Sequence, residues 1–362
     1  MLTRMVTDKL AEYSYNAALA GLHYSLSAQV LQSSLTVAVQ GYNHKLPLLT
    51  QTILEALAGF KGGEEDSELF RRLHDRLLKD YANDLLAQPY QLAMAATAHL
   101  LVVPYSTRDK LEAARTLTPS LLRSFLPRLL HQCRLEALVY GNATEAQAMA
   151  LFERTRTALK RPTPLPAPVL RGLGWRVVSL EEGEEVHYRA ACENPEEPNH
   201  GVQVSYQLGP QSVPLSTRLD LLVLLLKDEA FNELRTKQQL GYIVFCAASG
   251  ANRHILSLSF LIQTVKDPSI ALAAIDAFLD YARTYLRGMS AEDYAANVSA
   301  LVDAKLEKPK NYAEQGNRYW NEIGKGAYLF DRAELEAAEA KTISKEELIE
   351  FLGACVGRRE GG

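Results

Sequence analysis

An arginine and a tyrosine lie seven residues apart, where a predicted helix gives way to a predicted strand. The segment FNELRTKQQLGYIVF places Arg235 near the end of the helix, which stops at Gly241, and Tyr242 at the start of the strand. Seven residues make two helical turns, so both side chains can point to one side of the corner. Arginine and tyrosine donors can bind a peptide backbone or stabilise an oxyanion. Alternatively, Arg235 caps the helix and Tyr242 packs at the edge of the core.

Other familiar chemistries lack their sequence signatures. None of the eight histidines forms an HExxH or HxxEH pattern, so we expect no catalytic metal site within this chain. No GxSxG elbow or phosphate-binding glycine loop is present. The four cysteines have no CxxC spacing, which favours free thiols in a reducing compartment, and Cys246 is predicted to be a small core residue.

Composition predicts an ordinary globular protein. The chain has 362 residues, 47% of them hydrophobic, and a net charge of −4, so nothing draws it toward nucleic acid or an anionic membrane. Its longest apolar run, Leu221 to Leu226, is far shorter than the roughly 20 residues that span a bilayer. No secretory signal precedes the first helix. We therefore expect a soluble, cytoplasmic protein with neither nucleic acid nor membrane as a partner.

Alternating prolines mark the predicted domain boundary. Residues 161–169 form a Pro-rich linker, since prolines cannot continue a helix or pair within a central strand. It separates domain 1–160 from domain 170–362. Both contain a glycine-ended helix, two strands and a Pro-opened helix, with Gly21 and Gly241 offset by 220 residues. The predicted fold class is α+β, with two similar domains that each have an antiparallel-rich sheet and helices packed on one face.

Several segments together resemble one peptidase family. FNELRTKQQLGYIVF looks like the signature of the insulysin (pitrilysin) branch of the M16 zinc metallopeptidases. LAEYSYNAALAGLHYSLS, LTVAVQGYNHKLPLL and EALVYGN, which predicts a strand over residues 134–140, resemble the third domain of that family. KLEKPKNYAEQGNRYWNEI resembles its fourth domain. The resemblance covers nearly the whole chain.

The resemblance implies an architecture and a set of site residues. Family members have four similar domains in two halves that close into a chamber, and the first half carries the HxxEH zinc motif. The second half is the opposite wall, where residues equivalent to Arg235 and Tyr242 bind the substrate backbone and support the tetrahedral intermediate. The resemblance also implies substrate contact by Phe231 and Asn232. Residues 1–160 then form a partial third domain, truncated at its N-terminus, and residues 170–362 the fourth domain.

A second, thinner signal concerns anions. Family members can bind polyanions through a basic patch on the second half, and Lys308 and Lys310 stand at the matching place. Since Asn311 follows them, the cluster is small, and these lysines can equally be solvated side chains at a helix end.

Two functions remain open at this point. The first is the C-terminal substrate-binding half of an insulysin-like zinc metalloendopeptidase, an enzyme that cleaves peptides in a closed chamber. This half alone would be inactive because HxxEH is absent. Its Zn²⁺ would be bound by an N-terminal catalytic half, within the same longer chain or as a separate subunit. The second is a non-catalytic M16 peptide-binding or core/partner subunit. An organellar location would require an upstream targeting segment.

Overall fold

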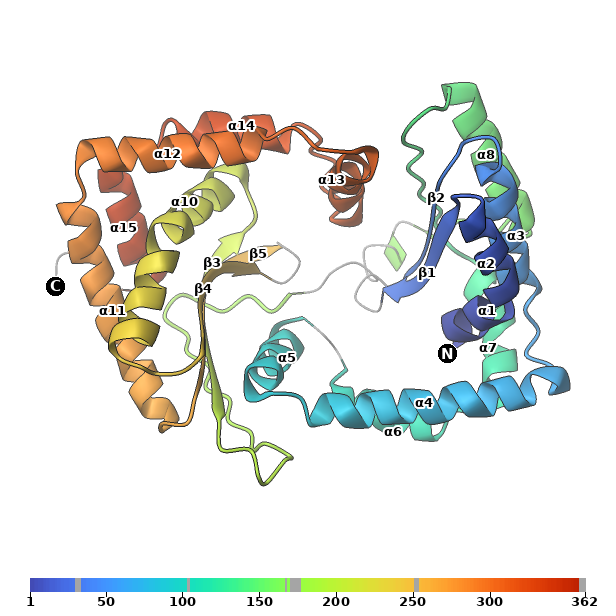
Figure 1. The fold of residues 1–362 in the computed structure, drawn as a ribbon, viewed down its shortest axis with the longest axis horizontal. Helices are drawn as coiled ribbons and strands as arrows, with labels where there is room; N and C mark the ends of the chain where they lie inside the picture. The colour runs from blue at the N-terminus through green and yellow to red at the C-terminus, as the bar shows by residue number, and fades with distance from the viewer. Residues whose placement is uncertain (30–33, 103–104, 167, 170–176, 251–253, 358–362) are drawn as a thin grey trace. The chain divides into compact units, whose positions relative to one another are not determined.

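The computed structural model of the chain describes residues 1–29, 34–102, 105–166, 168–169, 177–250 and 254–357 (Figure 1). Its internal contacts divide the chain into two compact units. The first unit is Met1–Asp84 with Thr107–Trp175, and the second is Leu85–Ser106 with Arg176–Gly362. The segment Leu85–Ser106 therefore packs with the second half of the sequence, although it lies within the first half of the chain.

The first unit packs helices against a two-stranded antiparallel sheet. Strand β1(His23–Gln29) pairs with β2(Ser34–Gln40), with His23 opposite Gln40. Its core joins the first helix to the third through buried Met5, Leu49 and Ile53. The helices are α1(Leu2–Lys9), α2(Ala11–Leu19), α3(Leu46–Gly59), α4(Ser67–Leu85), α6(Thr107–Arg115), α7(Pro119–His131) and α8(Glu145–Ala158), with a 3₁₀ turn at Glu64–Asp66.

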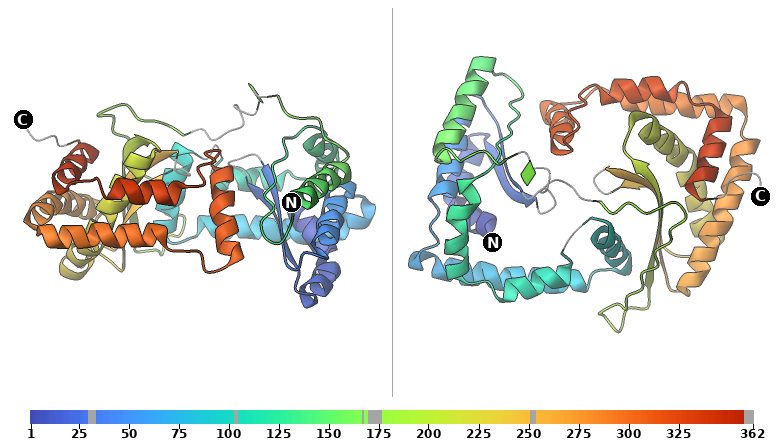
Figure 2. Two further views of the ribbon diagram at one scale, coloured as in Figure 1. Left: turned by 90° about the horizontal axis from the view of Figure 1, so that it is seen from above. Right: turned by 180° about the vertical axis from the view of Figure 1, so that it is seen from behind.

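The second unit is built on a three-stranded antiparallel sheet in the order β3-β5-β4. The strands are β3(His200–Pro210), β4(Ile243–Gly250) and β5(Ile255–Thr264). The helices are α5(Pro89–Leu101), α10(Val213–Ala230), α11(Pro268–Gly288), α12(Ala291–Leu306), α13(Tyr312–Gly324), α14(Arg332–Ala340) and α15(Lys345–Cys355), and a π-helical segment, η2(Phe231–Lys237), continues α10. The views in Figure 2 show α12 running beside α14.

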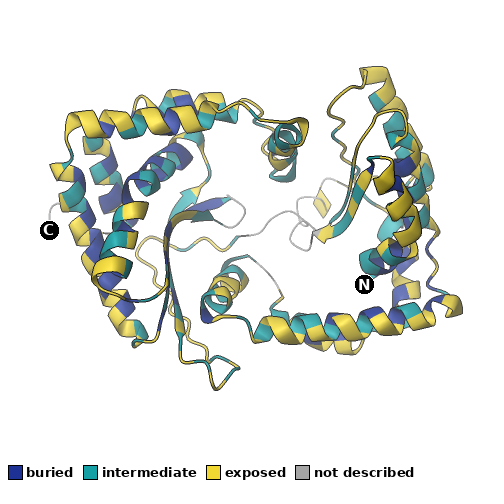
Figure 3. Cartoon of the chain, in the orientation of Figure 1, coloured by how far each residue is buried: buried dark blue, intermediate teal, exposed yellow. Residues whose placement is uncertain are grey.

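One face of this sheet forms the main core. Alternate residues of β5, including Leu258 and Phe260, point toward α10 and α11, and the Phe260 and Phe278 rings meet edge to face with centroids 5.8 Å apart. Figure 3 shows the buried residues concentrated on these elements. The opposite face is more polar, and α5 approaches it where the Tyr90 amide donates to the Gln263 side chain at 3.1 Å. A sequence pattern of alternating side chains thus produces two different faces.

A partly buried charge network connects α10 to its neighbours. Lys305 of α12 donates to Asp220 of α10 at 2.5 Å and to Glu336 of α14 at 2.6 Å. The Ser216 hydroxyl of α10 also donates to Glu336, which is 4% exposed. Because an unpaired buried carboxylate is costly, this network fixes the helix that leads to Arg235.

The α+β fold class expected from sequence is confirmed, with two local corrections. The helix expected over residues 216–240 is wrong at its end, since α10 gives way to η2. The strand expected over residues 134–140 is wrong as well. Among the described residues, no strand pairs with this segment, and only a single bridge between Gln132 and Thr163 lies beside it. Without a partner strand, β-rich sequence remains an extended segment.

Candidate functional site

The candidate site lies where α10 becomes η2 and then β4. A π-helix spaces its hydrogen bonds one residue wider than an α-helix, and such turns are frequent at functional sites because they redirect side chains. Leu234 is fully buried inside η2 and anchors it in the core. Phe231 and Arg235 therefore lie on the outer side of a segment whose inner side is fixed.

The Arg235 guanidinium is held between two aromatic rings. Its Cζ atom lies 4.5 Å from the centroid of the Phe231 ring and 4.5 Å from that of the Tyr242 ring. Cation–π contacts of this kind hold a guanidinium flat while its N–H donors remain in the plane between the rings. Tyr242 is 80% exposed and Phe231 41% exposed. Within the described part of the chain, no carboxylate pairs with Arg235, so its donors are available to a ligand.

The backbone between these side chains follows a tight path. Gln239 adopts the left-handed conformation, with φ of 52°, and its amide donates to the Arg235 carbonyl at 3.1 Å. At Gly241 a Cβ atom would lie 1.8 Å from the Gln263 carbonyl oxygen, so only glycine fits there. The pairing of β4 with β5 begins immediately afterwards at Ile243. The turn thus brings Tyr242 back over Arg235.

A polar group lies on the neighbouring side of the same helix. Lys237 donates to Glu233, and this hydrogen bond raises the pKa of the lysine. The Tyr281 hydroxyl of α11 donates to Glu229 at 3.1 Å, and desolvation, with this contact, raises the pKa of the phenol. The sequence did not lead us to this cluster of interacting side chains, although the four-residue spacing of Glu229, Glu233 and Lys237 predicts a shared helix face.

The remaining predicted site residues have different surroundings. Asn232 is half-buried within η2. Lys308 and Lys310 are exposed after the end of α12, and Lys310 pairs with Glu307 at 3.3 Å. A lysine already paired with a carboxylate is a weaker anion ligand. The structure thus brings Phe231, Arg235 and Tyr242 into one cluster, whereas the lysines lie in the connection between α12 and α13.

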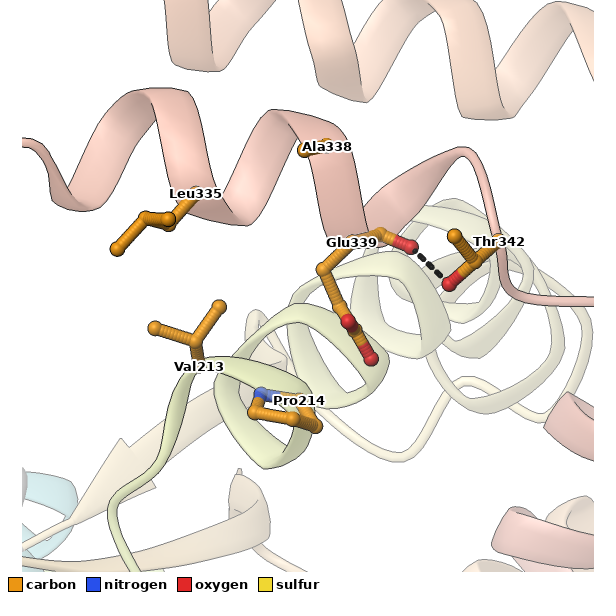
Figure 4. A pocket seen from close by; sticks show the side chains of 6 residues that line it. All are labelled: Val213, Pro214, Leu335, Ala338, Glu339 and Thr342. Carbon is orange, nitrogen blue, oxygen red and sulfur yellow. Dashed lines mark hydrogen bonds between the residues drawn. The ribbon is translucent and has the colours of Figure 1, made fainter.

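A pocket also lies at the other end of α10. Its volume is about 380 Å³, and Figure 4 shows it between the first turn of α10 and α14, lined by Val213, Pro214, Leu335, Ala338, Glu339 and Thr342. The Thr342 hydroxyl already donates to the Glu339 carbonyl at 2.8 Å. Val213, where α10 begins, lies roughly 30 Å along the helix from Arg235, given a rise of 1.5 Å per residue. This pocket has too few free polar groups to suggest chemistry.

The described residues do not provide a metal site. No group of three or more His, Cys, Asp or Glu side chains that could bind a metal ion is found among them. Burial raises the pKa of Cys246 to about 12, which keeps this thiol protonated. None of the described helices is both long and apolar enough to cross a membrane.

Comparison with known proteins identifies relatives of the whole chain. The family described as the middle or third domain of peptidase M16 matches residues 1–114, and the PQQ synthase PqqF-like C-terminal lobe domain 4 matches residues 221–320. The insulin-degrading enzymes of Bos taurus and Homo sapiens are each 33% identical over 96% of this chain. Insulin-degrading enzyme-like 1, peroxisomal, of Arabidopsis thaliana is 32% identical over 97% of it.

The chain spans about a third of the length of these relatives, covering 34%, 34% and 36% of them. The crystal structure of pitrilysin superposes with a TM-score of 0.83 at 22% identity, over 97% of this chain and 36% of that one, and shows a shared fold. The peptidase M16 inactive domain from Pseudomonas fluorescens gives a TM-score of 0.62 at 12% identity, over 96% and 83% respectively. Sequence and fold agree that this chain is an insulysin-like C-terminal region of the M16 peptidase family.

Proposed function

We propose that this chain is the substrate-binding half of an insulysin-like zinc metalloendopeptidase. The observation that supports this function best is the Arg235 guanidinium held between the Phe231 and Tyr242 rings, with Tyr242 80% exposed. An arginine fixed in this way loses little conformational freedom when it binds a carbonyl. Residues 1–160 then belong to the third domain and residues 170–362 to the fourth.

Each residue has a distinct task in this proposal. Arg235 donates to a backbone carbonyl of the substrate near the scissile bond. The Tyr242 phenol donates to the oxyanion that develops on that bond, which favours the transition state over the ground state. Phe231 and Asn232 line the same surface. In this proposal the zinc ion and its ligands belong to a segment outside this chain.

Replacing Tyr242 by phenylalanine in the complete enzyme tests this role. Y242F removes one hydroxyl and keeps the ring over Arg235, so kcat should fall about tenfold or more because one transition-state donor is lost. The matched control is Y281F, which removes the hydroxyl that donates to Glu229 and should leave kcat unchanged. An unchanged kcat in Y242F would remove Tyr242 from the mechanism.

A non-catalytic partner subunit is the second candidate. The Pseudomonas fluorescens M16 inactive domain favours it, since its fold superposes on this chain with a TM-score of 0.62. An immunoblot of source cells against a peptide from this chain separates the two. A band well over twice 40 kDa supports a single longer peptidase, whereas a band near 40 kDa supports a separate subunit whose catalytic partner can then be isolated with it.

The remaining assignments follow from the same proposal. Peptides are the substrates, and the N-terminal catalytic half is the partner. The proposed location is the cytoplasm. An organelle is the alternative, because the Arabidopsis thaliana relative is named as a peroxisomal protein. Lys308 and Lys310 remain a proposed polyanion contact, to be tested by the salt dependence of binding to an anionic polymer.

A further inference from the structure

The two outer strands of the second-unit sheet are protected very differently. β3 has a bulge between Gln207 and Gly209, and such bulges discourage further pairing. The Gln207 side chain donates to the Val178 carbonyl and accepts from the Leu180 amide, both at 2.9 Å, so another segment is fastened to β3. At Gly201 the Pro89 carbonyl of α5 occupies the space where a Cβ would stand, so α5 lies against the face of β3 there. β3 is therefore bulged, held by another segment at Gln207 and covered on one face by α5.

β4 has none of these protections. Its eight residues, IVFCAASG, include no charge and no proline, and its register with β5 runs from Ile243 to Gly250 without a shift. No described residue pairs with the outer side of this strand. Phe245 is 54% exposed on it. A straight, uncharged outer strand presents unpaired main-chain donors and acceptors, and proteins normally avoid this unless the strand binds another one.

The free side of β4 continues into the candidate site. Ile243, its first residue, directly follows Tyr242, and the ring of Tyr242 lies over Arg235. A segment paired along β4 would therefore run on to two side chains that donate hydrogen bonds to carbonyls. Both places can bind the main chain of a peptide. The unpaired N–H and C=O groups of β4 would pair with its amides and carbonyls, and the donors of Arg235 and Tyr242 would bind carbonyl oxygens beyond the end of the strand.

We propose that the outer side of β4 binds an extended segment of the peptide substrate as an added fourth strand, whose end is then held by Arg235 and Tyr242. This inference rests on the proposed function and defines the substrate as a peptide with an extended, uncharged stretch. Main-chain pairing supplies affinity without reading sequence, and the uncharged side chains of β4 disfavour charged side chains at the matching positions of the peptide.

The first experiment removes main-chain donors from the peptide and leaves its side chains unchanged. The probe is a fluorescein-labelled peptide of about ten Val, Thr and Ala residues with blocked ends, added to the 362-residue chain and followed by fluorescence anisotropy. N-methylation of every second residue along one side of the probe should weaken its binding at least tenfold, about 1.4 kcal/mol. N-methylation of the alternate residues should weaken it less. Equal affinity for all three probes would overturn the proposal.

The second experiment changes the strand. Of two neighbouring residues in an antiparallel strand, one directs its N–H toward the partner strand and the other away from it. Of A247P and A248P, therefore, one removes a bond to β5 and lowers the melting temperature, while the other removes only an outward donor. The variant that keeps its melting temperature should lose probe binding at least tenfold. Full probe binding by that stable variant would contradict strand addition.

The outcomes separate this inference from the proposed function. If R235A weakens probe binding while N-methylation and the stable proline variant do not, the site stands and strand addition is wrong. If the stable proline variant weakens binding and R235A does not, strand addition stands and the Arg235 site is wrong. Sedimentation tests the alternative occupant: a dimer that the stable proline variant dissociates, with no effect on the probe, would assign this strand to a second copy of the chain and overturn the proposal.

Discussion

In both units a helix gives way to a strand near a glycine, but the two corners differ in backbone conformation and in the side chains that they place there. In the first unit, α2 ends before Gly21, and β1 follows; in the second, η2 ends before Gly241, and β4 follows. The 220-residue offset places Tyr15 and Leu22 where the second unit has Arg235 and Tyr242. Leu22 is 6% exposed and Tyr242 80% exposed.

The position after the glycine therefore serves a different purpose in each unit. The first unit uses the position after its glycine to add a leucine to the core, whereas the second uses it to hold a tyrosine over a guanidinium. The glycines also differ. Gly21 has φ of 72° and faces the side chain of Tyr42, while Gly241 faces the backbone carbonyl of Gln263, which is paired within the sheet. The corner with the candidate chemistry is therefore the more rigidly constrained.

The largest predicted effect tests that constraint. G241A should lower the free energy of unfolding by about 4 kcal/mol, because its Cβ would lie 1.8 Å from the Gln263 carbonyl oxygen and β4 must move away from β5. The matched control, G21A, should cost about 1–2 kcal/mol, the price of a left-handed alanine. Guanidinium unfolding followed by circular dichroism measures both. Equal losses would show that the two corners are constrained alike.

The next effect concerns the helix behind the second corner. K305M removes the lysine that pairs with both Asp220 and the buried Glu336 and leaves Glu336 with the longer contact to Arg332, at 3.7 Å, so the free energy of unfolding should fall by about 3 kcal/mol. The control, K310M, removes an exposed partner of Glu307 and should cost less than about 0.5 kcal/mol. Urea unfolding measures the free energy of unfolding of both variants. If K305M is no worse than its control, buried charge does not fasten α10.

Much of this arrangement follows from sequence patterns. The Gly-ended helix, the two strands and the Pro-opened helix were predictable in both halves because glycine, proline and β-branched residues act locally. Arg235 and Tyr242 were predictable as a pair from their spacing. The stacking of Phe231 on Arg235 could not be predicted, because it depends on the π-helical turn at Phe231, which has no local sequence signature.

Long-range pairings account for what the sequence did not reveal. The strand expected over residues 134–140 has suitable residues but no described partner strand, and a strand requires one. Leu85–Ser106 packs with residues far along the chain, through contacts such as that of Tyr90 with Gln263. Glu322 and Glu336 are buried although charged residues usually stay exposed, because Arg332 reaches Glu322 from α14 and Lys305 reaches Glu336 from α12.

A third prediction uses pH to test the buried carboxylate Glu322 and its ion pairs. Burial raises the pKa of Glu322, but hydrogen bonds from Arg332 and Lys325 outweigh it and hold the pKa below the ordinary 4.5. The resulting stabilisation is complete above pH 4.5 and is lost as the pH falls through the lower pKa of the folded state. E322Q should cost about 2 kcal/mol at pH 7, and this difference from wild type should shrink in acid.

Melting curves between pH 3 and 7 measure that difference. The control is E350Q, at an exposed position of α15, whose melting temperature should follow the wild type throughout the range. A constant gap between E322Q and wild type would mean that the packing of Glu322 matters and its charge does not.

The smallest predicted effect on stability belongs to the residue with the largest proposed role. Y242L copies the residue of the first corner into the second and should change the free energy of unfolding by less than about 1 kcal/mol, since Tyr242 is 80% exposed and only its contact with Arg235 is lost. L22A at the matching position should cost about 3 kcal/mol, because Leu22 is buried. Thermal unfolding compares them, and peptide binding should show the reverse order. If Y242L destabilised the fold as much as L22A, the tyrosine would be a structural residue, and both corners would serve the core alone.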